Sequence, residues 1–258
     1  MHICFYKYQG CGNDFIMIDN RSGEYNLTVE QIRKLCDRKF GIGADGLIML
    51  NNHEHYAFEV DYSNADGSKS FCGNGARCSV AFARLLGLDC DSVIFLAIDG
   101  EHQAKTENGE ISVMMQNVIS IEEIGKDYTL NTGSPHYVRF VEDIEPVHVV
   151  DFGKSIRYAE EFRKEGINVN IVEEQPGNLR VHTYERGVED ETLSCGTGVT
   201  AAALAYAYKN ERTGTNDICI HTKGGKLNVR FTYEQPHQFM DIWLKGPAEM
   251  TFRGEADV

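Results

Sequence analysis

The chain has 258 residues, 42% of them hydrophobic, and a formal net charge of −14 at pH 7. A chain of this length can bury one large core, or two cores in domains of about 125 residues each. The acidic balance argues against nucleic acid or an anionic membrane as a partner, because both select basic protein surfaces.

Eight cysteines are spread along the chain, at positions 4, 11, 36, 72, 78, 90, 195 and 219. No C-x-x-C pair occurs, and the closest spacings do not match the usual zinc-ligand patterns, so we expect no metal site. The first residues lack the basic and then apolar pattern of a signal peptide, and no apolar run approaches the roughly 20 residues of a membrane span. We therefore expect a cytoplasmic protein with reduced thiols.

Two strands are predicted at the start of the chain, at residues 3–8 and 15–19. A helix should follow, because Thr28 and Gln31 have the spacing of a capping box, and we expect it to end near Phe40. Residues 41–46 then match G-x-G-x-x-G literally. A dinucleotide fingerprint has a strand before it and a helix after it, whereas the reverse order is predicted here, so we reject a nicotinamide site.

The remaining elements alternate between strands and single apolar helices, with Asn108-Gly109 as a hairpin turn. Strands are expected at 56–62, 93–97, 101–107, 110–116, 128–131, 136–141, 168–172, 179–185, 218–222, 226–234, 239–244 and 248–254, and a charged helix at 155–164. This pattern, with one dominant helix in each half of the chain, predicts an α+β protein in which sheets curl around buried helices. We place the domains at residues 1–117 and 118–258, with the last strand, 246–258, as a candidate to return to the first.

Two stretches repeat one pattern, 195 − 72 = 123 positions apart: Cys72-Gly73-Asn74-Gly75-Ala76-Arg77 and Cys195-Gly196-Thr197-Gly198-Val199-Thr200. Each puts a cysteine on a glycine-rich turn before an apolar helical run, so each cysteine should lie at a helix N-terminus. Such a terminus favours anions, both a bound carboxylate and a thiolate, and lowers a thiol pKa from about 8.5 to roughly 3.5–7.5. A single such cysteine is more often a small buried hydrophobe. The duplication favours two thiols that face one substrate.

Several stretches resemble diaminopimelate epimerase, in order along the chain: Gly12-Asn13-Asp14-Phe15, Asn64-Ala65-Asp66-Gly67-Ser68, Cys72-Gly73-Asn74-Gly75-Ala76-Arg77-Cys78, Tyr184-Glu185-Arg186-Gly187 and Cys195-Gly196-Thr197-Gly198. The resemblance implies two pseudo-symmetric domains, each a mostly antiparallel sheet wrapped around a central apolar helix, with the active site in the cleft between them. It also implies a homodimer that acts on diaminopimelate without pyridoxal phosphate or metal, in lysine and cell-wall precursor synthesis.

The resemblance also implies the roles of individual residues. Cys195 would take the α-proton from the L,L substrate while Cys72 donates one on the other face, with the roles reversed in the other direction. His136 would tune the thiols. The residues that match substrate-binding positions are Asn13, Asn64, Gly73, Asn74, Asn168, Glu185, Arg186, Gly196 and Thr197. Arg186 suits a carboxylate because its planar fork binds one bidentately, and Glu185 suits an ammonium group.

The chain departs from the family pattern at two positions near the substrate. Ser134 stands where the family has a substrate-binding asparagine, and Gly46 stands where many members have a glutamine. Two alternatives remain open. The first is another two-cysteine racemase, acting on proline or hydroxyproline. The second is a redox-sensing or binding protein in which Cys72 and Cys195 form a reversible disulfide.

Overall fold

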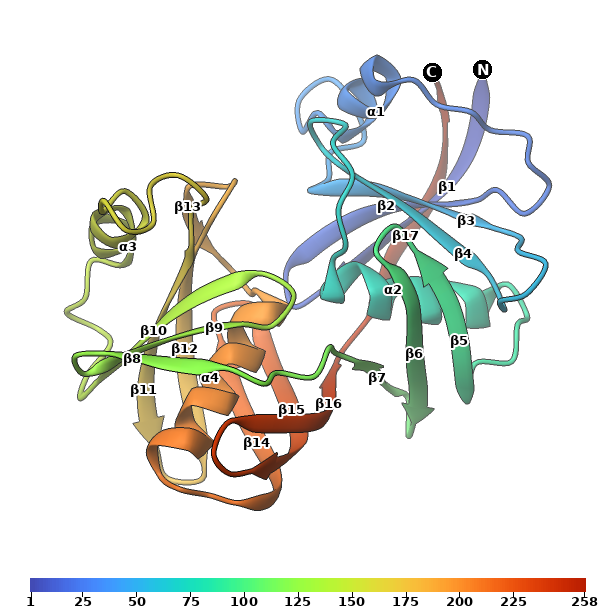
Figure 1. Cartoon of the computed structure of the whole chain (residues 1–258). Helices are drawn as coiled ribbons and strands as arrows, with labels where there is room; N and C mark the ends of the chain where they lie inside the picture. Colours follow the sequence, from blue (N-terminus) through green and yellow to red (C-terminus); the bar gives the residue numbers. More distant parts are fainter. The chain divides into compact units, whose positions relative to one another are not determined.

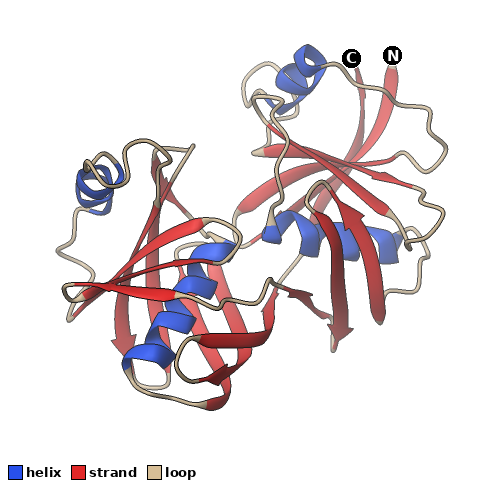
Figure 2. Cartoon of the chain, viewed as in Figure 1, coloured by secondary structure: helices blue, strands red, loops and turns tan.

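The computed structural model describes all 258 residues and divides into two compact units. The first unit comprises Met1–Val113 with Gly246–Val258, and the second comprises Met114–Lys245. Strands dominate both units, and each contains two helices (Figures 1 and 2). No helix combines the length and apolar character that crossing a membrane requires.

The elements of the first unit follow the predicted alternation. They are β1 (His2–Gly10), β2 (Asn13–Asp19), α1 (Val29–Cys36), β3 (Gly46–Asn51), β4 (Glu59–Asn64), α2 (Gly73–Leu85), β5 (Ser92–Ala97), β6 (Gly100–Glu107), β7 (Glu110–Met114) and β17 (Glu249–Asp257). The last of these pairs with β1, so the two chain termini lie side by side (Figure 1).

The second unit contains the remaining elements. They are β8 (Ile121–Ile124), β9 (Asp127–Asn131), β10 (Pro135–Val141), α3 (Val149–Arg157), β11 (Asn168–Gln175), β12 (Asn178–Glu185), β13 (Asp190–Thr192), α4 (Gly196–Lys209), β14 (Gly214–Thr222), β15 (Gly225–Glu234) and β16 (Gln238–Gly246). The short strand β13 pairs only with β12.

Both units have the same strand topology. The first pairs its strands in the order β17-β1-β2-β3-β4-β5-β6-β7. The second uses β8-β9-β10-β11-β12-β14-β15-β16. In each order the third and fifth pairs are parallel and the others antiparallel. A parallel pair needs a crossover connection, and each of the four crossovers contains one of the four helices. The chain is therefore a structural duplication.

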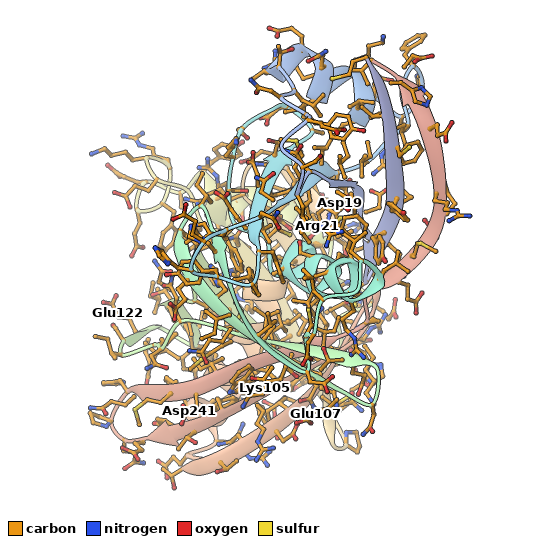
Figure 3. All side chains as sticks on the ribbon, turned by 90° about the vertical axis from the view of Figure 1, so that its right-hand side faces the viewer. Asp19, Arg21, Lys105, Glu107, Glu122 and Asp241 are labelled. Carbon is orange, nitrogen blue, oxygen red and sulfur yellow. The ribbon has the colours of Figure 1, made fainter.

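The central helix of each unit is buried because it is apolar around most of its circumference. Strands of the same unit lie on more than one side of α2 and of α4 (Figure 1). In α4 half of the buried positions are alanine, which lets the surrounding strands approach the helix backbone closely. Outward positions of the strands are charged, as Lys105 and Glu107 of β6 illustrate beside the buried Ala104 (Figure 3). At the end of β2, Arg21 donates two hydrogen bonds of 2.8 Å to Asp19 (Figure 3). The predicted α+β fold is confirmed.

Two helix predictions were wrong at their ends. The helix expected to reach Phe40 ends at Cys36, because the Asp37 carboxylate accepts hydrogen bonds from the N–H groups of Lys39 and Phe40 and turns the chain. The helix expected at 155–164 is α3, at 149–157. A Cβ atom on Gly153 would lie 2.3 Å from Cγ of Tyr184, so this glycine lets the helix backbone approach β12. The sequence analysis also missed β8 and β13.

Candidate active site

The first cysteine motif forms the start of α2, as predicted. Cys72 is the N-cap residue in extended conformation, and its sulfur accepts a hydrogen bond of 3.5 Å from the N–H of Gly75. The side chain is partly exposed. The N–H groups of the first turn have no acceptor within the helix and carry its positive dipole end, so negative charge is stabilised there.

The second motif forms the start of α4 in the same way. Cys195 is the N-cap residue, also extended, and its side chain is 7% exposed. Its sulfur lies 3.5 Å from the hydroxyl of Thr197. The Thr132 hydroxyl donates to the carbonyl of Thr197 at 2.8 Å and ties the preceding loop to this helix turn. The predicted helix N-terminal position of both cysteines is confirmed.

A chain of amide hydrogen bonds connects Cys72 to neighbouring strands. The Cys72 thiol and the Asn74 amide both donate to Oδ1 of Asn13, each at 3.4 Å. The amide nitrogen of Asn13 donates to Asp45 at 2.7 Å. The orientation of the Asn13 amide is therefore fixed from both ends, and its oxygen points at the thiol. Asp45, within the rejected G-x-G-x-x-G stretch, is thus a support for Asn13.

Charged side chains hold Asp45 in turn. Arg38 donates to Asp45 and to Asp14, each at 2.7 Å, and Lys7 pairs with Asp14 at 2.6 Å. Burial acts to raise the pKa of Asp14, but hydrogen bonds from Arg38 and Lys7 outweigh it and lower that pKa. The Asp14 carboxylate is therefore charged at neutral pH, and it is paired with Arg38 and Lys7.

Tyr62 fills the space beside Gly46. A Cβ atom on Gly46 would lie 2.4 Å from the Tyr62 ring and 2.6 Å from the carbonyl oxygen of Ser63. The Tyr62 hydroxyl donates to Oδ1 of Asn64 at 2.8 Å, while the Asn64 nitrogen donates to Ser68 and Ser70. The Asn64 amide therefore holds the loop that leads to Cys72.

The second unit brings Ser134, Asn168 and Arg186 together. The Asn168 amide donates to the Ser134 hydroxyl at 2.9 Å and accepts from the Arg186 backbone N–H at 2.8 Å. The Arg186 guanidinium also reaches the Ser134 hydroxyl at 3.4 Å and the carbonyl of Glu165 at 2.9 Å. Asn168 is 3% exposed, whereas Arg186 is exposed. Glu185 accepts a hydrogen bond from Thr192 at 2.9 Å.

His136 lies in a buried polar network rather than on the surface. Its Nδ1 is 3.1 Å from the Asn170 amide nitrogen, and the Asn170 oxygen accepts from Thr183 at 2.9 Å, which fixes the amide orientation. Nδ1 of His136 is thus an acceptor, and the proton lies on Nε2, which is buried without a hydrogen-bond partner. Burial, with the charge of Arg186, lowers the pKa of His136 to about 3. The imidazole is therefore neutral at physiological pH.

Sequence reasoning gave no role to several residues that support the site: Asp45, Tyr62, Arg77, Asn170 and Thr183. Arg77 donates hydrogen bonds to the carbonyl of Gly73 and the amide oxygen of Asn74, the two residues after Cys72. It is the one supporting residue that the sequence marks, as a charged residue inside an otherwise apolar helical run. The others are brought to the site by strand pairing. No group of three or more His, Cys, Asp or Glu side chains is arranged to hold a metal ion.

Solved structures share this fold. A Bacillus anthracis phenazine biosynthesis protein of the PhzF family superposes with a TM-score of 0.79 at 14% identity over 100% of both chains. A hydroxyproline epimerase from Agrobacterium vitis, with bound trans-4-OH-L-proline, gives 0.70 at 12% identity over 98% of this chain and 92% of that chain. The chain thus has the fold that these PhzF-family and epimerase structures share.

The sequence comparisons define the family more narrowly. A family model described as Diaminopimelate epimerase matches residues 5–121 and 128–251. A diaminopimelate epimerase from Flavobacterium psychrophilum is 49% identical over 251 residues, which cover 96% of this chain and 97% of the relative. The chain belongs to the diaminopimelate epimerase family.

Proposed function

We propose that this protein is an epimerase that interconverts L,L- and meso-diaminopimelate, with Cys72 and Cys195 as the two proton-transfer groups. One observation carries the proposal beyond family membership: each of two units with the same topology presents a cysteine as the N-cap of its central helix. Inversion of a stereocentre needs a base on one face and an acid on the other, and a duplicated thiol meets that need.

The proposed reaction conserves protons at every step. The Cys195 thiolate removes the α-proton of the L,L substrate and becomes a thiol, and the electron pair of the broken C–H bond spreads onto the α-carboxylate. The Cys72 thiol then donates its proton to the opposite face and becomes a thiolate. The reverse reaction exchanges the two roles. We propose that both thiols reach one substrate, as this chemistry requires.

The two helix N-termini supply the stabilisation of negative charge in this proposal. The α-carboxylate gains charge as the proton leaves, and fixed N–H donors favour that change most when water is excluded. Gly73 and Asn74 begin α2, and Gly196 and Thr197 begin α4. We propose that these turns bind the α-carboxylate and that protein groups alone, without pyridoxal phosphate or metal, carry the reaction.

The charged residues of the second unit suit the rest of the substrate. We propose that the exposed Arg186 binds a carboxylate and Glu185 an ammonium group. Asn168 and Ser134 hold Arg186 in place through the hydrogen bonds described above. Asn13 and Asn64 do the same for the loops around Cys72. His136 acts as a neutral positioning group, because its lowered pKa keeps the imidazole from taking up a proton at physiological pH.

Compartment and assembly are further parts of the proposal. Eight free cysteines suit a reducing compartment, and we propose the cytoplasm. We also propose a homodimer. Its support within the fold is the outer strand β17, where Met250 is 45% and Phe252 is 49% exposed. Light scattering after gel filtration measures the mass directly.

The test is to incubate reduced protein with L,L-diaminopimelate, L-proline or hydroxyproline, with chelator present, and to separate the stereoisomers by chiral chromatography. The proposal expects meso product from diaminopimelate alone, lost in Cys72→Ala and in Cys195→Ala. Cys4→Ala, at an exposed cysteine on β1, is the matched control and should remain active. Turnover of proline instead would favour the other racemase. No turnover of any substrate would favour the binding or redox protein.

A further inference from the structure

Arg77 is a buried cation without a carboxylate partner. Its side chain is fully buried on α2, one and a half turns after Cys72. The guanidinium donates to three neutral oxygens: the carbonyl of Gly73 at 3.3 Å, Oδ1 of Asn74 at 2.6 Å and the carbonyl of Pro247 at 3.5 Å. Burying a charge costs free energy unless an opposite charge lies near it. A negative charge close to Arg77 would therefore be stabilised.

Three thiols lie close enough to interact with the charge of this cation, Cys11, Cys72 and Cys78, and Cys11 also hydrogen-bonds with it. Burial acts to lower the pKa of Arg77, and the charge of these three groups when ionised acts against that effect. Burial raises the pKa of Cys11 and of Cys78, which are 1% and 0% exposed. Cys72 is the partly exposed member of the three and the helix N-cap. Its ionisation is therefore the one that burial opposes least.

Hydrogen bonds connect Arg77 to Cys72 through Asn74 and Asn13. Arg77 binds the backbone carbonyl of Gly73, the residue next to Cys72, and it fixes the amide of Asn74. That amide then donates to Asn13, which accepts from the Cys72 thiol. The acceptor oxygen of Asn13 favours the protonated thiol, whereas the cation and the Gly75 N–H favour the thiolate. Arg77 and Asn13 therefore have opposite effects on the protonation of the Cys72 thiol.

We propose that Arg77 is a positioning residue that stabilises the thiolate form of Cys72, the form this cysteine takes once it has donated its proton to the L,L substrate, with Asn13 as the opposing group. The residue is particular to the first half of the duplication. The matching position in the second motif is Thr200, whose hydroxyl donates to the carbonyl of Gly196. This inference rests on the proposed role of Cys72 in proton transfer, but its test needs no substrate.

Other titratable groups near Cys72 are common to all the variants compared. They are Cys11 and Cys78, Tyr62 of β4 in the same small pocket, Glu249 of β17 beside Cys11, and Asp45 beyond Asn13. His102 of β6 stacks on Phe71, whose ring centroid is 4.0 Å away, and pairs with Asp99. Because these groups stay the same, differences between variants report on Arg77 and Asn13.

The experiment measures the pH dependence of Cys72 alkylation by iodoacetamide, resolved by peptide mass spectrometry, in full-length protein carrying Cys195→Ala. Exposed Cys4 is the internal reference for reagent reactivity. We expect a Cys72 midpoint below the ordinary thiol value of about 8.5. Arg77→Met should raise it by about one pH unit or more, the scale of a neighbouring charge. Arg77→Lys should keep it low, and Asn13→Ala should lower it further.

Two results would overturn the proposal. One is a starting midpoint at or above the ordinary thiol value. The other is an unchanged midpoint in Arg77→Met protein whose circular dichroism and thermal unfolding are native. If Arg77→Met fails to fold, the Cys72 midpoints of the starting protein and of Arg77→Lys decide. Two low midpoints support the proposal, and a midpoint at the ordinary thiol value in either protein contradicts it. If the wild-type protein epimerises no diaminopimelate while the Cys72 midpoint in the Cys195→Ala background is low, the proposed function is contradicted and the role of Arg77 stands.

Discussion

Gly198 and Gly75 occupy the same position in the two cysteine motifs, three residues after each cysteine, yet alanine should affect them differently. A Cβ atom on Gly198 would lie 2.4 Å from Oδ1 of Asn170 and 3.2 Å from Cβ of Cys195. A Cβ atom on Gly75 would lie 3.1 Å from Cδ1 of Ile48, the end of a flexible side chain. We predict that Gly198→Ala destabilises the protein and that Gly75→Ala does not.

The magnitude follows from what Asn170 would lose. Its amide hydrogen-bonds with His136, Tyr137 and Thr183, and a displaced amide breaks at least two of these bonds. Each is worth about 1 kcal/mol, and overpacking adds roughly 1–3 kcal/mol. The higher helix propensity of alanine over glycine stabilises the helix by about 1 kcal/mol and offsets part of this cost. The net cost for Gly198→Ala is therefore at least about 2 kcal/mol, whereas propensity and the mild Ile48 contact nearly cancel for Gly75→Ala.

Thermal unfolding of the two variants measures this difference. For a chain of this size about 2 kcal/mol lowers Tm by roughly 4–8 °C. A double-mutant cycle isolates the contact, because Gly198→Ala should cost clearly less in an Asn170→Ala background. Equal Tm values for the two glycine variants, or additive effects of Gly198→Ala and Asn170→Ala, would refute the reasoning.

Three further predictions concern the supports of the site. Gly46→Ala should lower Tm, because the new Cβ atom would lie 2.4 Å from the Tyr62 ring. Adding Tyr62→Ala to the same chain should restore part of the lost Tm. An unchanged Tm in Gly46→Ala would contradict this prediction. Burial lowers the pKa of His136 from 6.5 to about 3. Its contribution to the free energy of unfolding should therefore be complete above pH 6.5 and should fall by about 1.4 kcal/mol per pH unit between pH 6.5 and pH 3. Urea titrations of His136→Gln should show a shallower fall. Asp45→Ala should lower kcat/KM about tenfold, because the Asn13 amide loses the acceptor that fixes its orientation. Asp45→Asn keeps an acceptor and should lower kcat/KM less. Equal losses in the two variants would show that Asp45 does not act by holding Asn13.

Local patterns predicted the elements that short-range chemistry determines. The Thr28 capping box, the Asn108-Gly109 hairpin and the cysteine N-caps each lie within a few residues of sequence, and all are present. The duplication was also visible in the sequence, because two glycine-rich turns precede two apolar helices. The structure extends it to the order and direction of the eight matched strands in each unit, with β13 as an addition to the second.

Contacts between distant segments could not be predicted from those patterns. Nothing near Asn13 in the sequence indicates that Asp45, 32 residues away, would fix its amide. The same holds for Tyr62 beside Gly46 and for Asn170 beneath Gly198, which depend on strand register and helix docking. The ends of α1 and α3 were misplaced because an Asp37 turn and the close approach of Gly153 to Tyr184 overrode the local helical pattern.

We propose that Cys72 and Cys195 act on opposite faces of one α-carbon, and deuterium incorporation from heavy water tests this proposal. Reduced protein is incubated with L,L-diaminopimelate in heavy water, and proton NMR follows substrate and product at early times. Two exchangeable thiols predict meso product that carries deuterium at the inverted carbon, while recovered L,L substrate keeps its α-proton. Meso product that retains the original proton would indicate a single base that returns it, and would contradict the account.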